Sequence, residues 1–576
     1  MAFQVSPGVL VQERDLTSII PAVSTSIGAV AGQFTKGPLD EIVSISSEQE
    51  LVETFGKPDV NNFEYFFSAA NFLQYSNTLR VVRANQTSQV NASTSGTGVL
   101  VKNTEDWTNN YASGGAAGNA TFVAREAGAY GNTLLVATCP NAAAFEEEGA
   151  TTVNDASTTV GDTAITVTAG TDLNVGDVIS FSTTAATNDY DDGEQYRVTN
   201  ISTNDLTIVQ HPRGSGGLKR TITDGANVRR RWRYYDAVDG APGTSDWTST
   251  RSGANDEIHI VVVDEDGSIS GVPGQILETY SKVSKASDAK TPQGDDNYYP
   301  NVIYTKSRYI WWTKHHSSGS NWGNAASGTT FTTVDTPSNE SLSGGSDGSA
   351  VTTGQLKTAY DKFADSETVD VGLIISGKCD STHVENLITI AEARKDCVVF
   401  ASPERADVVN VTNANTQKDN VIDFYSSISS SSYVFFDSGY KYMYDRYNDV
   451  YRYVPLNGDM AGLAARTDLI ADSWFSPAGF NRGVVRGAVK LAFNPTKTQR
   501  DELYPKRINP VATFPGQGTV LFGDKTGLAS PSAFDRINVR RLFITLEKAI
   551  STASKFQLFE FNDEFTRANF RNIVEP

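Results

Sequence analysis

The sequence predicts a multidomain α+β protein, and three observations lead to this fold class. The chain has 576 residues, more than a single hydrophobic core usually serves, so roughly three to five domains are expected. Short apolar strands bounded by turn residues fill the middle of the chain, whereas strands alternate with helices over residues 349–475. Hydrophobic residues make up 39% and charged residues 20% of the sequence, which is typical of a globular chain.

The first 95 residues predict an extended arm followed by an α/β segment. Two prolines oppose helix formation in residues 1–25, and no apolar periodicity there would close a core. The expected elements are a short strand at Val9, Leu10 and Val11, a small-residue strand at 26–32, a helix that opens at Ser47 and ends near Gly56, an aromatic helix at 63–75 and a buried strand at 78–83.

Residues 145–220 are expected to fold as a separate β module. Four short runs of strand character follow one another at intervals of ~10–17 residues, and Gly or Asp turns separate them. This spacing predicts a small β-barrel inserted into a surface loop. The preceding residues 96–144 are rich in Ser, Gly and Asn before a strand at 134–137. The four runs of the module are 164–167, 178–181, 195–198 and 206–209.

The remainder predicts β structure first and an α/β layer afterwards. Residues 258–263 form an apolar strand that meets a turn at 264–267, and residues 275–280 follow as a second strand or a short helix. Residues 317–348 have the composition of loops. The alternation over 349–475 predicts a partly parallel sheet. Its expected strands are 369–375, 397–401 and 433–437, its helices are 382–394, 419–429 and 456–466, and helices at 496–503 and 538–551 end the chain.

Charge is unevenly distributed along the chain. The net charge is −19, which argues against a role in coating nucleic acid. Residues 476–576 nevertheless hold 15 Lys and Arg against 9 Asp and Glu, a net of +6, whereas residues 145–215 have a net charge of −10. The basic segment suits an acidic partner, although a solvated basic face would show the same pattern.

Cysteine use and apolar patterning exclude several protein classes. Cys139, Cys379 and Cys397 are too few and too scattered for a disulfide framework, and Cys379 and Cys397 are expected to be core thiols. The first 20 residues lack the pattern of a signal peptide, and no apolar stretch approaches the ~18 residues of a membrane span. We therefore expect synthesis in a reducing cytosol and no direct insertion into a membrane.

Motifs that suggest enzyme chemistry each lack an essential part, so we expect no catalytic, cofactor-binding or metal site. A P-loop-like run at 518–526 has Asp524 where a phosphate would lie, and the turn at 264–267 lacks the glutamate of a calcium loop. His315 and His316 are adjacent, which suits exposed loop residues better than ligands. Residues 433–453 hold seven tyrosines, which favour a packed interface or core over a carbohydrate-stacking surface.

Sequence motifs from both ends resemble the tail sheath proteins of contractile-tailed phages, and the C-terminal stretch is most similar to the T-even-like branch. Further matches follow in the same order over nearly the whole chain. The matching segments are 6–15, 28–32 with 37–38, 55–56, 79–83, 124–132, 342–348, 476–483, 514–526 and 534–542.

The resemblance implies a nested architecture of domains. Residues 1–25 with 476–576 would form an inner, tube-facing α/β sheath core with an N-terminal linking arm. Residues 26–95 with 346–475 would form an α/β middle domain, and 96–144 with 221–345 a β-rich outer domain. The barrel at 145–220 would be outermost. Family members continue for several strands beyond the position of 567–571, so we expect the 576 residues to be either a truncated chain or part of a longer product.

The resemblance also implies a mechanical function without ATP. Identical subunits would polymerise as stacked hexameric rings around a tail tube, joined by extended arms that add strands to neighbouring sheets. Contraction would drive the tube through the host cell envelope. The implied partners are further copies of the chain, the tail tube protein, and baseplate and tail terminator proteins, in a virion synthesised in the host cytoplasm. Lys548 and Lys555 are candidates for facing the tube, and the alternative role for Arg540 and Arg541 is to hold the domain together.

Three alternatives remain at this level. A sheath of a bacterial contractile injection particle or bacteriocin would share the mechanism and differ in cargo. A secreted adhesin with a carbohydrate-binding barrel would require a secretion signal. An α/β enzyme centred on residues 349–475 would require converging polar residues at strand ends, which the sequence does not indicate.

Overall fold

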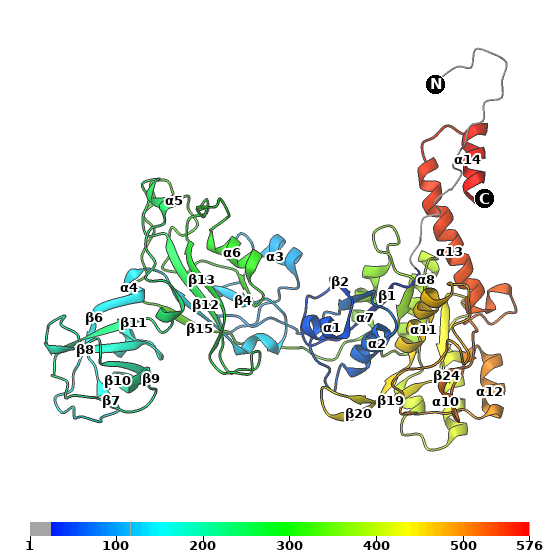
Figure 1. Ribbon diagram of the computed structural model, residues 1–576, viewed down its shortest axis with the longest axis horizontal. Coiled ribbons are helices and arrows are strands. Elements are labelled where there is room, and N and C mark those ends of the chain that lie inside the picture. The colour runs from blue at the N-terminus through cyan, green and yellow to red at the C-terminus, as the bar shows by residue number, and fades with distance from the viewer. Residues whose placement is uncertain (1–24, 116, 575–576) are drawn as a thin grey trace, which may run out of the picture. The chain divides into compact units, whose positions relative to one another are not determined.

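The computed structural model describes residues 25–115 and 117–574, and its fold is a mixed α+β architecture with several sheets (Figure 1). The chain divides into two compact units. Unit 1 consists of Met1–Gln86 and Ala350–Pro576, and unit 2 is the continuous stretch Thr87–Ser349. Unit 2 therefore interrupts unit 1 in the sequence.

A seven-stranded sheet forms the centre of unit 1 and confirms the predicted parallel layer. Neighbouring strands are parallel except for the antiparallel pair β2–β3. Most of its strands are continuous apolar runs buried on both faces, which is the pattern of a parallel sheet. The order is β2 (Ile42–Ile45), β3 (Leu79–Arg83), β1 (Gly28–Gly32), β16 (Leu373–Ile375), β17 (Val398–Ala401), β18 (Val434–Asp437) and β22 (Ile508–Asn509).

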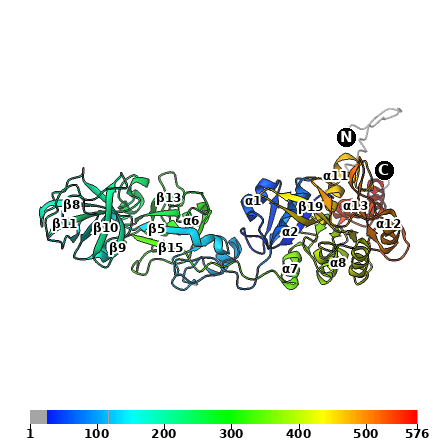
Figure 2. The ribbon, with the colours of Figure 1, turned by 90° about the horizontal axis from the view of Figure 1, so that it is seen from below.

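Helices cover both faces of this sheet. α2 (Phe63–Leu73) and α11 (Asn457–Ile470) pack together on one face, and α7 (Thr353–Tyr360) and α8 (Ser381–Arg394) pack together on the other (Figure 2). Further helices of this layer are α1 (Glu48–Phe55), α9 (Arg405–Val408) and α10 (Ala414–Ser426). The predicted ends of α1 are confirmed. Ser47 Oγ accepts a hydrogen bond from the Glu50 amide, and Gly56 ends the helix at a φ of 83°.

Unit 1 also contains two smaller sheets and the C-terminal helices. A three-stranded sheet has the order β20 (Val450–Pro455), β19 (Tyr440–Asp445), β21 (Lys490–Leu491), and β23 (Val511–Phe514) pairs with β24 (Gly518–Leu521) as a hairpin. The last helices are α12 (Lys497–Leu503), α13 (Ile537–Ser554) and α14 (Glu564–Val574). α13 extends away from the seven-stranded sheet, with α14 beside its far half (Figure 1).

Unit 2 is dominated by β structure. The first of its sheets has the order β13 (Gln275–Ser284), β12 (Glu257–Asp264), β5 (Leu134–Cys139), β15 (Ser338–Ser341), so residues 275–280 form a strand rather than a helix. β4 (Phe122–Ala124) pairs with β14 (Ile310–Trp312). The helices of unit 2 are α3 (Thr104–Asn110), α4 (Ala142–Phe145), α5 (Asp246–Ser249) and α6 (Tyr299–Lys306).

The four strands predicted within residues 145–220 are confirmed, and the structure adds two more. The six-stranded sheet has the order β6 (Glu146–Thr152), β11 (Ala226–Arg231), β8 (Val178–Ala185), β9 (Gln195–Ser202), β10 (Asp205–His211), β7 (Ala164–Thr166). The sequence analysis did not predict β6 and β11, because β6 begins with three glutamates and β11 ends in three arginines, and such charged runs lack the apolar pattern of a strand. Their side chains pair across the strands, with Arg231 Nε 2.9 Å from Glu146 Oε2, so this sheet reaches Arg231.

α2 and α11 approach closely because α11 carries two glycines at the crossing. A Cβ atom on Gly458 would lie 2.1 Å from the carbonyl oxygen of Ser68, and one on Gly462 would lie 2.4 Å from the Tyr75 ring. Neither contact can be relieved without moving the backbone or a buried ring. The helix pair therefore depends on the absence of side chains at these positions.

We expect Gly458→Ala to lower the free energy of unfolding of unit 1 by about 1–3 kcal/mol, the usual cost of overpacking a core. Gly354→Ala in α7 is the matched control, because no heavy atom lies within 4 Å of a Cβ there. That control should be neutral or stabilising by up to about 1 kcal/mol. Chemical denaturation followed by circular dichroism distinguishes the two variants. Equal stability of both variants would contradict the proposed steric constraint.

Candidate functional site

Within the basic C-terminal segment, the first half of α13 is held against the core of unit 1 by two arginines. Arg541 is buried, and its Nη2 donates to both carboxylate oxygens of Asp468 at 2.7 Å. Arg540 Nη2 donates to Ser432 Oγ at 2.7 Å, and its guanidinium lies 4.0 Å from the centre of the Phe534 ring. The structure thus supports the structural alternative for this arginine pair, which holds the helix against the core.

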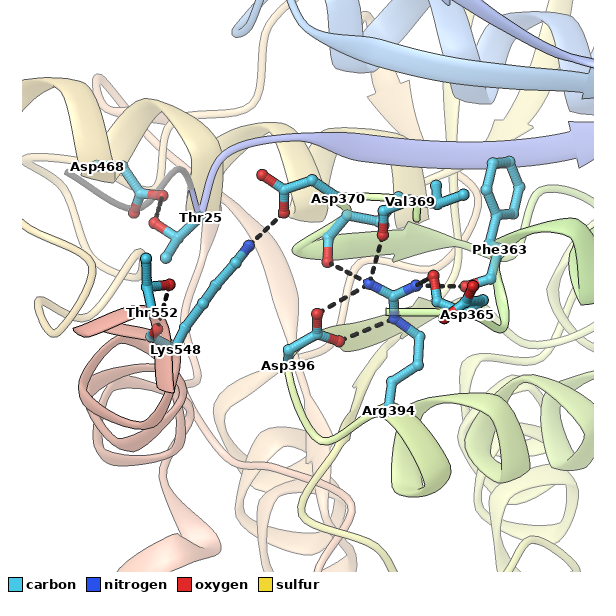
Figure 3. Close-up of polar contacts among 11 residues, drawn as sticks. Thr25, Phe363, Asp365, Val369, Asp370, Arg394, Asp396, Asp468, Lys548 and Thr552 are labelled. Carbon is cyan, nitrogen blue, oxygen red and sulfur yellow. Dashed lines mark hydrogen bonds and ion pairs between the residues drawn. The ribbon is translucent and has the colours of Figure 1, made fainter. Parts of the chain in front are cut away.

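Lys548 lies about two turns further along α13 and forms an ion pair with Asp370 (Figure 3). Its side chain is only 16% exposed. Asp370 belongs to the segment that precedes β16, and Arg394 holds that segment in place. The Arg394 guanidinium donates to the carbonyl oxygen of Val369 at 2.9 Å and pairs with Asp396 at 2.8 Å. The Lys548 ammonium is therefore engaged within its own chain.

Lys555 differs from Lys548 because it is exposed. It follows α13 directly and begins the short 3-10 turn Lys555–Gln557. The ion-pair partner of Lys548, Asp370, is not shared with Lys555 among the residues that the structure describes. Val9, Leu10 and Val11, predicted as the linking arm, lie outside the described residues.

The β23–β24 hairpin carries a cluster of three aromatic rings at the surface. Phe480, Phe514 and Phe522 contact one another with ring centres 5.1–5.8 Å apart. Phe480 and Phe522 remain exposed. Residues 483–485 run along the outer edge of β24, where the Val485 amide donates to the Thr519 carbonyl oxygen at 2.9 Å and the Leu521 amide donates to that of Gly483 at 2.8 Å. A two-stranded sheet is marginal by itself, so the hairpin depends on these flanking contacts.

The motifs that suggested enzyme chemistry have structural partners. Asp524 accepts a hydrogen bond from the Tyr504 hydroxyl at 2.8 Å and pairs with Arg536 at 2.7 Å. Asp264 accepts from the amides of Ile269 and Ser270, which confirms a turn there. Among residues 25–115 and 117–574, no group of three or more His, Cys, Asp or Glu side chains could hold a metal ion.

The prediction that His315 is an exposed loop residue is wrong. Its ring packs 4.8 Å from Trp312, and both ring nitrogens lie within hydrogen-bonding distance of tyrosine hydroxyls, those of Tyr298 and Tyr299. Burial lowers the pKa of His315 to about 4. The sequence concealed this environment because Tyr298 and Tyr299 lie at the start of α6, 17 and 16 residues before His315.

Sequence inspection also missed buried charges in the core of unit 1. Lys441 Nζ pairs with Asp459 at 2.9 Å, and both side chains are fully buried. Asp437 accepts from Ser402 Oγ at 2.7 Å, and burial raises the pKa of its carboxyl to about 8. The one available signal was Lys441 inside a tyrosine-rich strand. Because a buried charge is stable only when paired, that position required a carboxylate nearby.

The cysteines agree with the expectation that Cys379 and Cys397 are core thiols. Cys379 and Cys397 are buried, as predicted, and Cys139 is buried as well. Burial raises the pKa of the Cys379 and Cys397 thiols to about 12. None of the helices in the described part of the chain is both long enough and apolar enough to cross a membrane.

Comparisons with known proteins identify the family. The family described as "Phage tail sheath protein central domain" matches residues 349–527, and "Tail sheath protein Gp18 domain III N-terminal region" matches residues 25–84. The tail sheath protein of Enterobacteria phage T4 is 33% identical over 98% of this chain and 88% of its own length. The tail sheath protein of Vibrio phage KVP40 is 31% identical over 99% of this chain and 89% of its own length.

Solved structures of sheath proteins resemble the chain more distantly. The sheath tail protein Lin1278 from Listeria innocua aligns over 97% of this chain and 86% of its own, at 10% identity and a TM-score of 0.44. The family assignment follows from the sequence relatives, which cover nearly the whole chain. On that evidence, the chain belongs to the family of phage tail sheath proteins.

Proposed function

We propose that this chain is the structural subunit of a contractile phage tail sheath, which polymerises helically around a tail tube and contracts to drive the tube through the host envelope. The observation that carries this function is the identity of 33% to a phage tail sheath protein over 98% of the chain. The subunit acts as a mechanical element and not as an enzyme. The energy for contraction is stored during assembly, and no nucleotide is consumed.

Subunits join by heterologous contacts, which build open helices when the rotation between copies does not close. In this proposal the N-terminal arm around Val9, Leu10 and Val11 adds a strand to a neighbouring subunit. Stacked hexameric rings of such subunits surround the tube, between the baseplate and the tail terminator.

The domains follow the nested order that the sequence implied. Residues 1–25 with 476–576 form the inner, tube-facing core, and 26–95 with 346–475 form the middle domain. Residues 96–144 with 221–345 lie further out, and 145–220 is outermost. The outermost module is a closed barrel, a proposal supported by the antiparallel bridge between Val153 and Val167, which connects the two edge strands of the six-stranded sheet.

The basic segment faces an acidic tube surface. Lys555 is the stronger candidate for this contact because its ammonium is exposed, whereas Lys548 is engaged by Asp370. Many solvent-screened pairs suit a contact that must be released during contraction better than a dry interface does. The protein is part of the virion and is made in the host cytoplasm.

Purified chain should form hollow tubes that are visible by electron microscopy. Deleting residues 1–24 should leave a folded monomer that no longer polymerises, because the arm supplies the backbone hydrogen bonds between subunits. Circular dichroism checks that the truncated chain is folded. Long tubes formed by the truncated chain would refute the linking role of the arm.

Lys555→Glu should weaken assembly on preformed tail tubes. Added salt should weaken assembly as well, and the two effects should add. Raising the salt from about 0.1 M to about 1 M shortens the Debye length from about 10 Å to about 3 Å and screens exposed pairs. Lys290→Glu is the control, because Lys290 is exposed in unit 2, outside the basic segment. Co-sedimentation with tubes measures binding. If tube binding is unchanged both by added salt and by Lys555→Glu, the proposal that Lys555 faces the tube is wrong.

Excising Glu146 to Arg231 should preserve polymerisation if the six-stranded module is outermost. The cut ends are adjacent, because the Trp232 amide donates to the Phe145 carbonyl oxygen at 2.8 Å, so a short linker can join them. Electron microscopy of the shortened chain checks the prediction. A folded product that forms no tubes would show that the module lies at a subunit contact.

A further inference from the structure

We propose that one face of the three-stranded sheet β20–β19–β21 is a docking surface for a second copy of this chain. The surface is formed by Tyr442, Tyr444, Tyr451 and Tyr453, and we call it the tyrosine face. The inference rests on the proposed function and extends it, because it assigns a subunit contact to particular side chains that lie outside the basic segment and the N-terminal arm.

The strand register places all four tyrosines on the same face. In the antiparallel pair β19–β20, Tyr442 lies opposite Tyr453 and Tyr444 lies opposite Tyr451. The ring centres are 4.6 Å apart in the first pair and 5.2 Å apart in the second. The rings of Tyr442 and Tyr451 stack diagonally at 5.3 Å with planes 16° apart. The four rings therefore form one continuous aromatic surface.

The opposite face of the same strands is already used inside unit 1. Lys441 forms the fully buried pair with Asp459, and Met443 lies in the core. Asp445 is buried as well and pairs with Arg452 at 2.8 Å. Since this opposite face packs against the core, the tyrosine face cannot be buried inside unit 1 by reversing the orientation of the sheet.

The tyrosine face is left open at its outer end by the described part of the chain. Tyr451 is 54% and Tyr444 45% exposed. The Tyr444 hydroxyl already donates to Asp449 Oδ1 at 2.6 Å, so the exposed remainder of that side chain is apolar. A solvated sheet face normally carries polar side chains, so an aromatic one is typical of a protein contact.

Tyrosine is well suited to such a contact. Each ring offers a large area with few rotatable bonds, so little conformational entropy is lost when it is buried. Stacking against neighbouring rings reduces that loss further because the rings are already ordered. Aromatic residues are enriched at the centres of protein interfaces for these reasons.

Charge favours a second copy as the occupant. Lys490 Nζ lies 4.8 Å from the centre of the Tyr442 ring and 5.8 Å from that of Tyr453, at the edge of the tyrosine face. Within the described ranges, no carboxylate forms an ion pair with Lys490. A second copy carries a net charge of −19 and so supplies acidic surface to this edge. A neutral polysaccharide would leave the lysine without a counter-charge.

The double variant Tyr444→Thr/Tyr451→Thr tests the proposal, because threonine keeps β propensity while removing the rings. We expect the concentration needed for tube formation to rise about tenfold or more, with unchanged circular dichroism. Tyr444→Phe/Tyr451→Phe retains the rings and should assemble like the unaltered chain. Val160→Thr/Val272→Thr is the matched control, since both valines are exposed in unit 2.

Hydroxyl-radical footprinting of the unaltered chain provides a measurement that does not depend on the variants. Tyr444 and Tyr451 should be modified in the monomer and protected in the tube formed by the chain alone. Equal modification in both states, or tube formation by the threonine variant at the usual concentration, would overturn the proposal. So would protection that appears only when tail tube protein or polysaccharide is added.

Failure of the proposed function would look different. If the unaltered chain forms no tubes, sedimentation velocity can compare the self-association of the unaltered chain with that of the threonine variant. Weaker self-association of the variant would still support the docking surface. Identical sedimentation of the two would contradict it.

Discussion

The pairing of β1 with β16 is the constraint on which the rest of the molecule depends. Gly28 pairs with Leu373 and Ala29 with Ile374, so two parts of the chain separated by more than 300 residues must meet at the centre of one sheet. The intervening unit 2 therefore has to leave unit 1 and return to it. The Ser349 amide donates to the Thr87 carbonyl oxygen at 3.1 Å, so the outgoing and returning strands of unit 2 run side by side. Insertions of this kind leave the inner sheet intact, because both ends of the inserted unit are held together.

Charged residues in unit 1 divide into two groups with different physical roles. Arg394, Arg541 and Lys441 are buried and satisfied by carboxylates or carbonyl oxygens, so removing any one would leave an unpaired buried partner. Lys555 and Lys490 are exposed, and in solvent their attraction to a partner is weak and screened by salt. The buried pairs keep the fold of the subunit, whereas the exposed lysines can exchange partners. This combination suits a subunit whose contacts with its neighbours change during contraction.

The aromatic residues show the same division between core and surface. Tyr440 is fully buried at the start of β19, whereas Tyr444 is 45% exposed four residues later on the same strand face. The change follows from the sheet leaving the core at its hairpin end. A strand that is aromatic throughout can therefore contribute to the core at one end and to an interface at the other.

The sequence by itself determined the elements whose signals are local. The cap residues of α1, the apolar parallel strands and the four strands between residues 164 and 211 were all predictable, because propensity and burial act over a few neighbouring residues. The family resemblance was equally visible, since it depends on short motifs in order. Only the tertiary structure shows which lysines of the C-terminal segment are engaged by a carboxylate of the same chain and which are exposed to solvent. Lys548 and Lys555 look equivalent in the sequence, yet Lys548 meets Asp370 from a distant segment and Lys555 does not. In the same way, β6 and β11 are strands because their opposite charges pair across the sheet, an interaction between residues about 85 positions apart that no local pattern records.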